Sequence, residues 1–436
     1  MVSAAPPRLS PTKKVCSTLM SSPSEKSAKL PFVVHLLSLG AFLMGTTEFI
    51  IAGILPELAA DLGVGVAQAG LLITAFAIGM IVGAPVMGLA TLRLPRRSTL
   101  VLALGVFAAG HVIAALSSSF TVVFAARVLS ALATGAFWAV ASVVATAAAG
   151  PAASSRAMGV MVSGAALATV VGVPVGTWAG QAVGWRGAFW ALAVLAVLAA
   201  GLIGRFVPAD KQRAAASVRS EFAALRQGRL WLSMSATALI TGGAMAAFSY
   251  ITPLLTERAG IAQGAVPLVL IGYGIGALAG TNLGGRLGDR KPLTTVAAAA
   301  LSAAVILLLL IPLSRMAVPT VVLVVLLGLA GMSVPPVVTS LAVRFAGNTP
   351  TLAAALAVSS FNTGIALGSW IAGSALDSSL GLTGPALVGA VMVSMGLAPL
   401  AALGALRATS TPEAQTAVSG VSLSPETETK RRHAAA

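Results

Sequence analysis

Glu48 and Arg127 stand out because each is a charged residue inside a long hydrophobic run. Glu48 lies in the run 31–55 and Arg127 in the run 120–146. A charge at the centre of a bilayer costs roughly 2.5–3.5 kcal/mol, so it persists where it has a partner or a task. A buried acid that can gain and lose a proton is suited to coupling proton movement to transport. We therefore predict Glu48 and Arg127 as proton-coupling residues.

Helix geometry favours contact between these two charges. If the first run crosses outward and the fourth inward, each residue lies about two turns from the outer end of its helix, roughly 10 Å deep at about 1.5 Å per residue. Contact is then feasible if the two helices line one cleft. An alternative stays open, in which Glu48 and Arg127 form a fixed pair that only orients the helices.

The composition indicates a membrane protein. Of the 436 residues, 57% are hydrophobic and 9% are charged, a balance that lipid tolerates and water does not. Each hydrophobic run is long enough for a helix of roughly 20 residues, which crosses the bilayer. The predicted fold is all-α and integral to the membrane, with twelve transmembrane helices at 31–55, 67–90, 98–117, 120–146, 157–182, 187–206, 230–256, 262–285, 293–313, 317–342, 350–374 and 382–406.

The net charge of +15 reports orientation. If both termini are cytoplasmic, most of the 27 Lys and Arg residues fall on the cytoplasmic side, while Arg186, Arg258 and Arg315 fall outside. This asymmetry follows the positive-inside rule. The expected surroundings are therefore a lipid bilayer, and no nucleic-acid partner is expected.

The chain divides into two helical halves with polar ends. Residues 1–30 and 408–436 are polar and predicted as disordered cytosolic tails. The predicted halves are 31–206 and 230–406, joined by a charged cytosolic linker at 207–229. Two segments recur in both halves at one offset, 83–93 with 280–290 and 184–187 with 381–384, which indicates a duplication of six helices.

Two further motifs carry glycines at short spacing. The segment 280–291 is glycine-rich and ends in an Asp-Arg pair and a lysine, and the first copy of this motif has Leu92 where an acid is expected. In the fifth run, Gly164, Gly172 and Gly176 would let helices approach closely, and Pro174 favours a kink. Ordinary small-residue packing is the alternative explanation.

On these motifs, together with Arg127 in 124–135, the chain resembles the twelve-helix drug:proton antiporter branch of the major facilitator superfamily (MFS) across 31–406. The resemblance implies an antiporter motif at Gly164, Gly172, Pro174 and Gly176. It also implies a cytosolic gate formed by Arg93, Arg96, Arg97, Arg286, Asp289 and Arg290. In this family the acid of the gate motif bonds to a neighbouring helix end; because Leu92 replaces it in the first half, the resemblance implies that Asp289 carries this role alone.

The segment Gly45-Thr-Thr-Glu-Phe-Ile-Ile-Ala-Gly-Ile-Leu-Pro56 is similar to the first helix of bacterial chloramphenicol-resistance and arabinose-efflux-like exporters. This implies efflux of a small neutral drug, chloramphenicol, in exchange for protons at a bacterial cell membrane, conferring antibiotic resistance. Export of sugars, nucleosides or other metabolites is the alternative.

An apolar cleft with a few hydrogen-bonding groups would suit such a drug. The candidate cleft residues are Phe42, Met44, Thr46, Thr47, Phe49, Phe137, Trp138, Met245, Phe248, Tyr250 and Asn362. Three scattered histidines and one cysteine predict neither an enzyme nor a metal site, and the chain has no Walker A motif. No cofactor is expected beyond the proton as coupling ion.

Overall fold

A computed structural model of the chain describes residues 30–90, 94–150, 153–208, 227–346 and 350–408. Within these ranges the backbone is almost entirely helical. The predicted tails, apart from residues 30 and 408, and most of the predicted linker lie outside the described residues.

Twelve spans in the described part of the chain are long and apolar enough to cross a membrane, which confirms the predicted fold class. The first six contain α2 (Phe32–Gly53), α4 (Val66–Ala90), α5 (Arg96–Leu116), α6 (Phe120–Ala149), α7 (Ser154–Leu167) continued by η3 (Ala168–Gly172) and α8 (Val173–Val183), and α9 (Trp185–Phe206). The second six contain α11 (Gly228–Ser249), α13 (Val266–Arg290), α14 (Pro292–Leu313), α15 (Ala317–Met332) followed by α16 (Val334–Ala346), α17 (Pro350–Leu376) and α18 (Gly384–Ala408). Short elements join them: α3 (Leu55–Leu62), α12 (Ile251–Pro253), η5 (Leu254–Arg258), η6 (Gln263–Ala265) and η7 (Gly381–Thr383).

The largest corrections to the predicted bounds occur on either side of residue 260. The run 230–256 is not one helix, because α11 ends at Ser249, four residues before Pro253, which has no N–H to donate to the Ser249 carbonyl and whose ring clashes with it. The run 262–285 is too short at its second end, because α13 continues to Arg290. The glycine-rich segment 280–290 is therefore helical.

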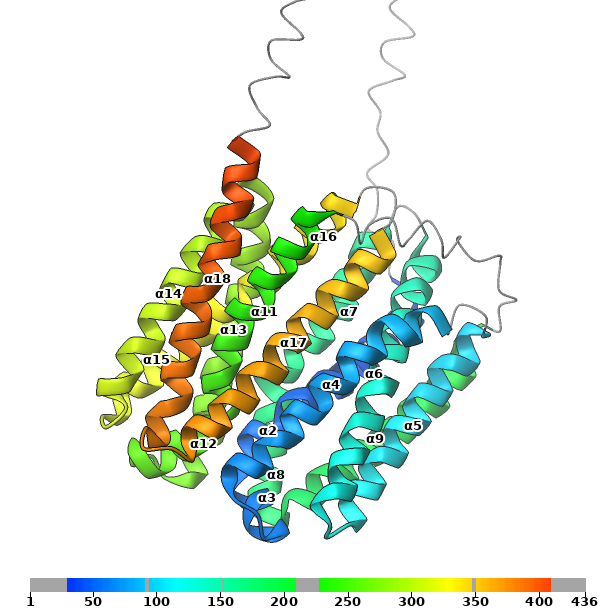
Figure 1. Cartoon of the computed structure of the whole chain (residues 1–436). Helices are drawn as coiled ribbons and strands as arrows, with labels where there is room; N and C mark the ends of the chain where they lie inside the picture. The colour runs from blue at the N-terminus through cyan, green and yellow to red at the C-terminus, as the bar shows by residue number, and fades with distance from the viewer. Residues whose placement is uncertain (1–29, 91–93, 151–152, 209–226, 347–349, 409–436) are drawn as a thin grey trace, which may run out of the picture.

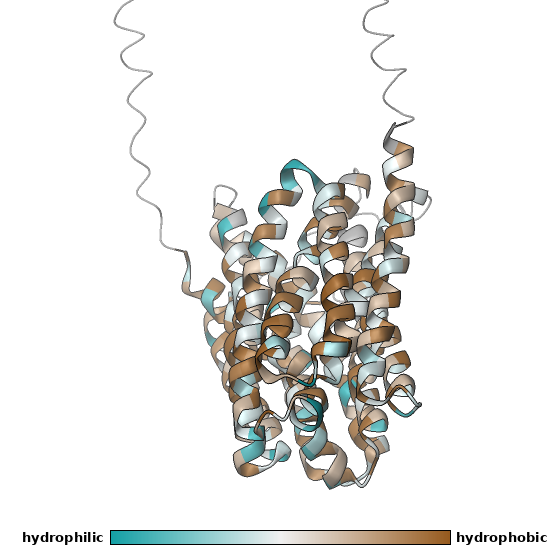
Figure 2. Cartoon of the chain, turned by 90° about the vertical axis from the view of Figure 1, so that its left-hand side faces the viewer, coloured by the Kyte–Doolittle hydropathy of each residue, from teal (hydrophilic) through white to brown (hydrophobic). Residues whose placement is uncertain are grey.

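The outward surface of the bundle is apolar. Brown and pale residues cover most of the helices in Figure 2. Large apolar side chains such as Leu268 (68% exposed) and Trp178 (64%) point away from the protein. Such exposure is stable where lipid replaces water, and helices satisfy their backbone hydrogen bonds internally there.

The two halves share their hydrophobic packing at the end of the bundle where α3 lies, at the bottom of Figure 1. We call this the α3 end. The largest apolar cluster spans both halves there and includes Leu58, Trp185 and Tyr250. A second cluster, with Val34, belongs to the first half alone, and a small one around Leu230 belongs to the second half alone.

Hydrogen bonds between the halves are concentrated toward the same end. They include Thr252 Oγ1 to Ala52 O (2.7 Å), Gln263 Nε2 to Glu57 Oε1 (2.8 Å), Gln181 Nε2 to Gln263 O (3.1 Å), the Thr74 and Ser369 hydroxyls (2.7 Å) and, deeper in the bundle, Ser359 Oγ to Ile81 O (3.0 Å). Most of these bonds are uncharged, so they can form and break without moving a charge.

Helices α2 and α11 are the most enclosed of the twelve spans. Helix α2 packs against α4, α6, α7, η3, α8 and α9 of its own half, and also contacts α11, α12 and α13. The helix that carries Glu48 is therefore surrounded by protein.

Glycines explain how closely α2 approaches the fifth span. A Cβ atom at Gly164, Gly172 or Gly176 would overlap α2 atoms of Ser38, Thr46 and Ile50, respectively. The predicted kink near Pro174 takes the form of the π-helical turn η3 directly before α8. Proline has no N–H to donate within a helix, and one π turn accommodates the mismatch.

Candidate substrate and proton site

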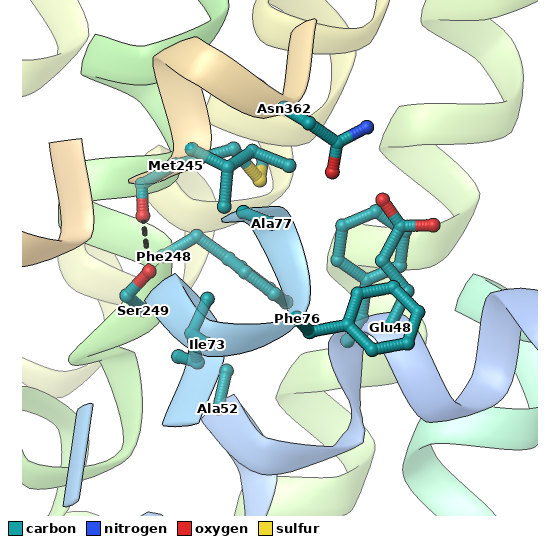
Figure 3. Close-up of a pocket in the computed structure, with 11 residues that line it drawn as sticks. Glu48, Ala52, Ile73, Phe76, Ala77, Met245, Phe248, Ser249 and Asn362 are labelled. Carbon is teal, nitrogen blue, oxygen red and sulfur yellow. Dashed lines mark hydrogen bonds between the residues drawn. The ribbon is translucent and has the colours of Figure 1, made fainter. Parts of the chain in front are cut away.

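A small pocket lies where the two halves meet, with about 10 Å³ of free space, which is room for about one water molecule. Two helices of each half line it (Figure 3). The lining residues are Glu48, Phe49 and Ala52 from α2, Ile73, Phe76 and Ala77 from α4, Met245, Phe248 and Ser249 from α11, and Asn362 and Ile365 from α17.

The sequence predicted five of these residues as site residues: Glu48, Phe49, Met245, Phe248 and Asn362. It missed the α4 wall altogether. Helix α4 is almost uniformly apolar, so its hydrophobic pattern does not distinguish the face toward the pocket from the face toward lipid.

Glu48 is the one acidic or basic side chain that lines the pocket. It is half-buried, and within the described residues it makes no hydrogen bond or ion pair. Around it stand the rings of Phe49, Phe76 and Phe248, with Phe49 edge-on to Phe248 at 6.3 Å between centroids. The carboxyl group is therefore available to a proton or to a bound molecule.

Arg127 contacts other groups instead of forming the expected ion pair with Glu48. Its Nη1 donates to Thr47 Oγ1 at 2.8 Å, and its Nε lies 3.4 Å from Leu72 O. The guanidinium carbon stands 4.5 Å from the centroid of the Phe76 ring. Within the described residues its Nη2 has no hydrogen-bond partner. Phe76 thus touches both the buried cation and the pocket.

Thr47 connects Arg127 to a buried histidine. Its hydroxyl lies 2.7 Å from His111 Nε2, and His111 Nδ1 lies 2.8 Å from Phe107 O. A carbonyl oxygen can only accept, so Nδ1 carries a proton. In the neutral ring Nε2 then accepts from Thr47, which accepts in turn from Arg127. These bonds form one continuous chain across α2, α5 and α6.

We expect the Thr47→Val variant to lower the initial rate of transport at least about tenfold. It leaves the buried Arg127 donor and the His111 acceptor without their shared partner, which costs about 1–3 kcal/mol per group. Thr47→Ser should restore the rate. The matched control is Thr46→Val, because the Thr46 hydroxyl bonds only to Phe42 O of its own helix. Equal rates for the two valine variants would contradict a role for the chain.

The remaining predicted cleft residues do not line this pocket. Phe42, Met44, Thr46, Phe137 and Trp138 pack within the first half. The Met44 sulfur accepts from Thr134 Oγ1 at 3.1 Å, and the Phe137 ring lies against Gly40. They determine how α2 and α6 fit together.

Tyr250 lies in the contact between the halves at the α3 end. Its hydroxyl donates to Ser369 O at 3.0 Å and lies 3.4 Å from Ala67 O of the first half. The ring fits because Gly70 and Gly373 leave room; a Cβ at either would overlap the phenol.

Comparison with models of known protein families identifies the family of this chain. The family model of the Major Facilitator Superfamily matches residues 37–372. The chain belongs to the major facilitator superfamily. It is therefore a multi-pass membrane transporter, as its motifs indicated.

Several MFS relatives match over most of their length. A chloramphenicol resistance protein of Streptomyces lividans is 36% identical over 84% of this chain and 95% of the relative. The inner membrane transport protein YdhP of Escherichia coli strain K12 is 32% identical, over 85% and 95%. An uncharacterized MFS-type transporter of Bacillus subtilis, YtbD, is 35% identical, over 82% and 91%.

Among solved structures, a bacterial homolog of the human lysosomal transporter Spinster, in an inward-facing and occupied conformation, superposes with a TM-score of 0.67. It is 15% identical over 85% of this chain and 95% of that one. At this identity the likeness supports the MFS fold alone.

The gate residues that the MFS resemblance implied lie at the opposite end from α3. Arg93 lies outside the described residues. Arg96 and Arg97 begin α5, and Arg286, Asp289 and Arg290 form the last turns of α13. Asp289 is exposed and makes no hydrogen bond or ion pair with any described residue. Among the described residues, this acid therefore does not form the bond to a neighbouring helix end that the resemblance implied.

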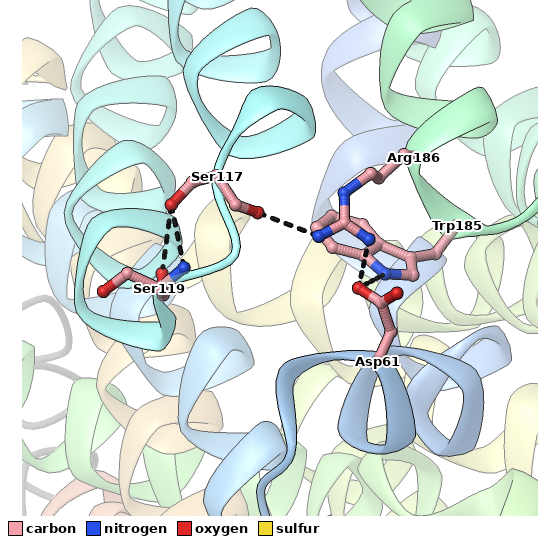
Figure 4. Close-up of polar contacts among 5 residues, drawn as sticks. All are labelled: Asp61, Ser117, Ser119, Trp185 and Arg186. Carbon is pink, nitrogen blue, oxygen red and sulfur yellow. Dashed lines mark hydrogen bonds and ion pairs between the residues drawn. The ribbon is translucent and has the colours of Figure 1, made fainter.

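The Gly-Trp-Arg-Gly segment of this MFS chain forms a clamp at the α3 end (Figure 4). Asp61 Oδ2 accepts from Trp185 Nε1 at 3.0 Å and forms an ion pair with Arg186, whose Nη2 donates to Ser117 O at 3.0 Å. Burial alone would raise the pKa of Asp61, but the hydrogen bonds from Trp185 and Arg186 and the charge of Arg186 hold that pKa below its usual value. The clamp joins α3, α5 and α9 and remains charged at neutral pH.

Proposed function

We propose that this MFS transporter exports a small neutral drug of the chloramphenicol type in exchange for protons, across the cell membrane of a bacterium. The observation that carries the proposal is the position of Glu48, an acid that forms no hydrogen bond or ion pair among the described residues, in an aromatic pocket between the halves. An anchor or a passive pore has no need of such a group.

The substrate class is supported by the walls and by one relative. Phe49, Phe76, Met245 and Phe248 offer an apolar surface to an aromatic ring, while Glu48 and Asn362 offer polar contacts. The matched protein of Streptomyces lividans carries the name chloramphenicol resistance protein, and its alignment covers nearly its whole length.

The proposed cycle uses two protonation states of Glu48. When the pocket opens to the cytoplasm, Glu48 releases its proton there and the drug binds. After the halves rock and the pocket opens outward, Glu48 takes a proton from outside and the drug leaves. Under the predicted topology the α3 end is the outer end, so the contacts at that end close the pocket to the outside here.

The proton gradient supplies enough free energy. One charge crossing 100 mV provides about 2.3 kcal/mol, and one pH unit adds about 1.4 kcal/mol. Together these sustain a concentration ratio of roughly several hundred for a neutral solute.

Uptake of labelled chloramphenicol into energised inverted vesicles tests this function. We expect accumulation by the wild-type protein that collapses when a protonophore is added. At the same proton gradient, vesicles that contain the protein should accumulate more chloramphenicol than vesicles that lack it. No accumulation would reject chloramphenicol as substrate, and the same vesicles would then be assayed with labelled sugars and nucleosides.

A further inference from the structure

The Asn362 side chain holds a fixed orientation in the pocket wall. Its Nδ2 lies 3.0 Å from Val358 O. A carbonyl accepts but cannot donate, so the nitrogen of the amide must face Val358 and the oxygen must face away from it. The side chain is 1% exposed, and within the described residues Oδ1 has no hydrogen-bond partner.

This orphaned oxygen belongs to the same pocket as Glu48. Figure 3 shows the Asn362 carboxamide and the Glu48 carboxyl directed toward a common space, with Phe76 nearby. Ser249 also lines the pocket, but its hydroxyl donates to Met245 O at 2.8 Å. When Glu48 is ionised, the pocket therefore presents hydrogen-bond acceptors from both halves, and the second N–H of Asn362 Nδ2 is the side-chain donor left among its lining residues.

The nearby cation narrows the ligand class. Acceptors among aromatic rings also suit lipophilic cations. Here the Arg127 guanidinium already lies against Phe76 at 4.5 Å from the ring centroid. A second positive charge beside that ring would meet like-charge repulsion in a site that water screens poorly. A neutral ligand with hydroxyl donors avoids this cost.

We propose that Asn362 is a specificity residue whose Oδ1 accepts a hydrogen bond from a hydroxyl of the substrate. A second donor of the same molecule binds ionised Glu48, and its aromatic ring lies among Phe49, Phe76 and Phe248. The inference rests on the proposed function and narrows its substrate class to neutral aromatic molecules with at least two hydrogen-bond donors. Protonation of Glu48 converts one carboxylate oxygen into a donor, which lowers the binding affinity for such a substrate.

The test compares two ligands that differ at their two hydroxyl groups, which are free in one ligand and methylated in the other. Purified full-length protein in lipid nanodiscs is titrated at neutral pH with chloramphenicol, which carries two hydroxyls, and with its di-O-methyl ether, which carries none. We expect Asn362→Leu to weaken chloramphenicol binding about tenfold or more, because the variant removes the acceptor. The same variant should change binding of the ether less than about twofold.

Two further variants keep the result interpretable. Asn362→Ser retains an acceptor while its own proton can bond to Val358 O, so it should recover part of the preference for chloramphenicol. Thr363→Val is the matched control, since the Thr363 hydroxyl bonds to Ser359 O of its own helix and does not line the pocket. It should leave the affinity for both ligands unchanged.

The contradicting outcomes separate this inference from the proposed function. The role of Asn362 is overturned if Asn362→Leu keeps the wild-type preference for chloramphenicol over the ether. It is also overturned if the Leu and Ser variants weaken the binding of both ligands equally. Either outcome leaves proton-coupled export untouched. Failure of the wild-type protein to bind chloramphenicol overturns the inference together with the proposed substrate. Preferential binding of tetraphenylphosphonium by the wild-type protein overturns the neutral class.

Discussion

Replacing Glu48 with glutamine is expected to abolish proton-coupled efflux while leaving membrane insertion intact. Glutamine preserves the size and hydrogen-bonding capacity of the side chain but cannot exchange a proton. Because no other acidic or basic side chain lines the pocket, no lining residue can take over the task. The accumulation ratio in energised vesicles should fall from roughly several hundred at most to about one.

The measurement is labelled chloramphenicol uptake in inverted vesicles, with and without a protonophore, at equal protein levels in the membrane. Glu257→Gln is the matched control, because Glu257 is exposed in η5 and has no hydrogen bond or ion pair within the described residues. It should transport like the wild type. Protonophore-sensitive accumulation by Glu48→Gln would reduce Glu48 to a structural charge and require another proton carrier.

The Gly274→Val variant is expected to reduce transport by at least about tenfold by preventing closure at the α3 end. Gly274 of α13 lies against the backbone of Thr169 and Val170 in η3, across the junction of the two halves. A Cβ there would overlap the Thr169 carbonyl. Backbone cannot rotate away as a side chain does, so the halves must separate. Each half should still fold, because its own packing is unchanged.

This effect can be measured as a change in accessibility. In a Cys16→Ser background, a cysteine at Met245 in the pocket would be labelled with a membrane-impermeant thiol reagent added from the α3 side. Labelling should be faster in the protein that carries Gly274→Val than in the same protein with Gly274 retained. Gly285→Val is the control on the same helix, since a Cβ at Gly285 meets open space. Slow labelling in both variants would show that the junction tolerates the added bulk.

The sequence was most informative at positions where a residue type is rare, such as a charged residue inside a hydrophobic run. A carboxylate in a hydrophobic run is costly, so the sequence alone singled out Glu48, which lines the pocket between the halves. Asn362 followed from its polarity, and Phe49, Met245 and Phe248 from their large apolar side chains on the expected helices. The twelve spans followed from length and hydropathy alone, because lipid demands both.

Side-chain partners could not be predicted in the same way. Arg127 and Glu48 lie at similar depth, yet depth does not determine rotation about the helix axis, and Arg127 bonds to Thr47 instead. The sequence offered His111 as a candidate for a proton relay but favoured a packing role, and it did not indicate the bond to Thr47. The α4 wall, with Phe76, was invisible because every face of that helix is apolar.

The enclosure of α2 has a consequence for the path of the proton. Most of this helix is covered by protein, and the part that carries Glu48 faces the pocket between the halves, so Glu48 faces other helices and not the acyl chains of the bilayer. Protons must reach it through water that enters between the halves, and the rate of proton exchange is then limited by how often that entrance opens. Lipid composition acts on the acid only indirectly, through the helices that stand between it and the membrane.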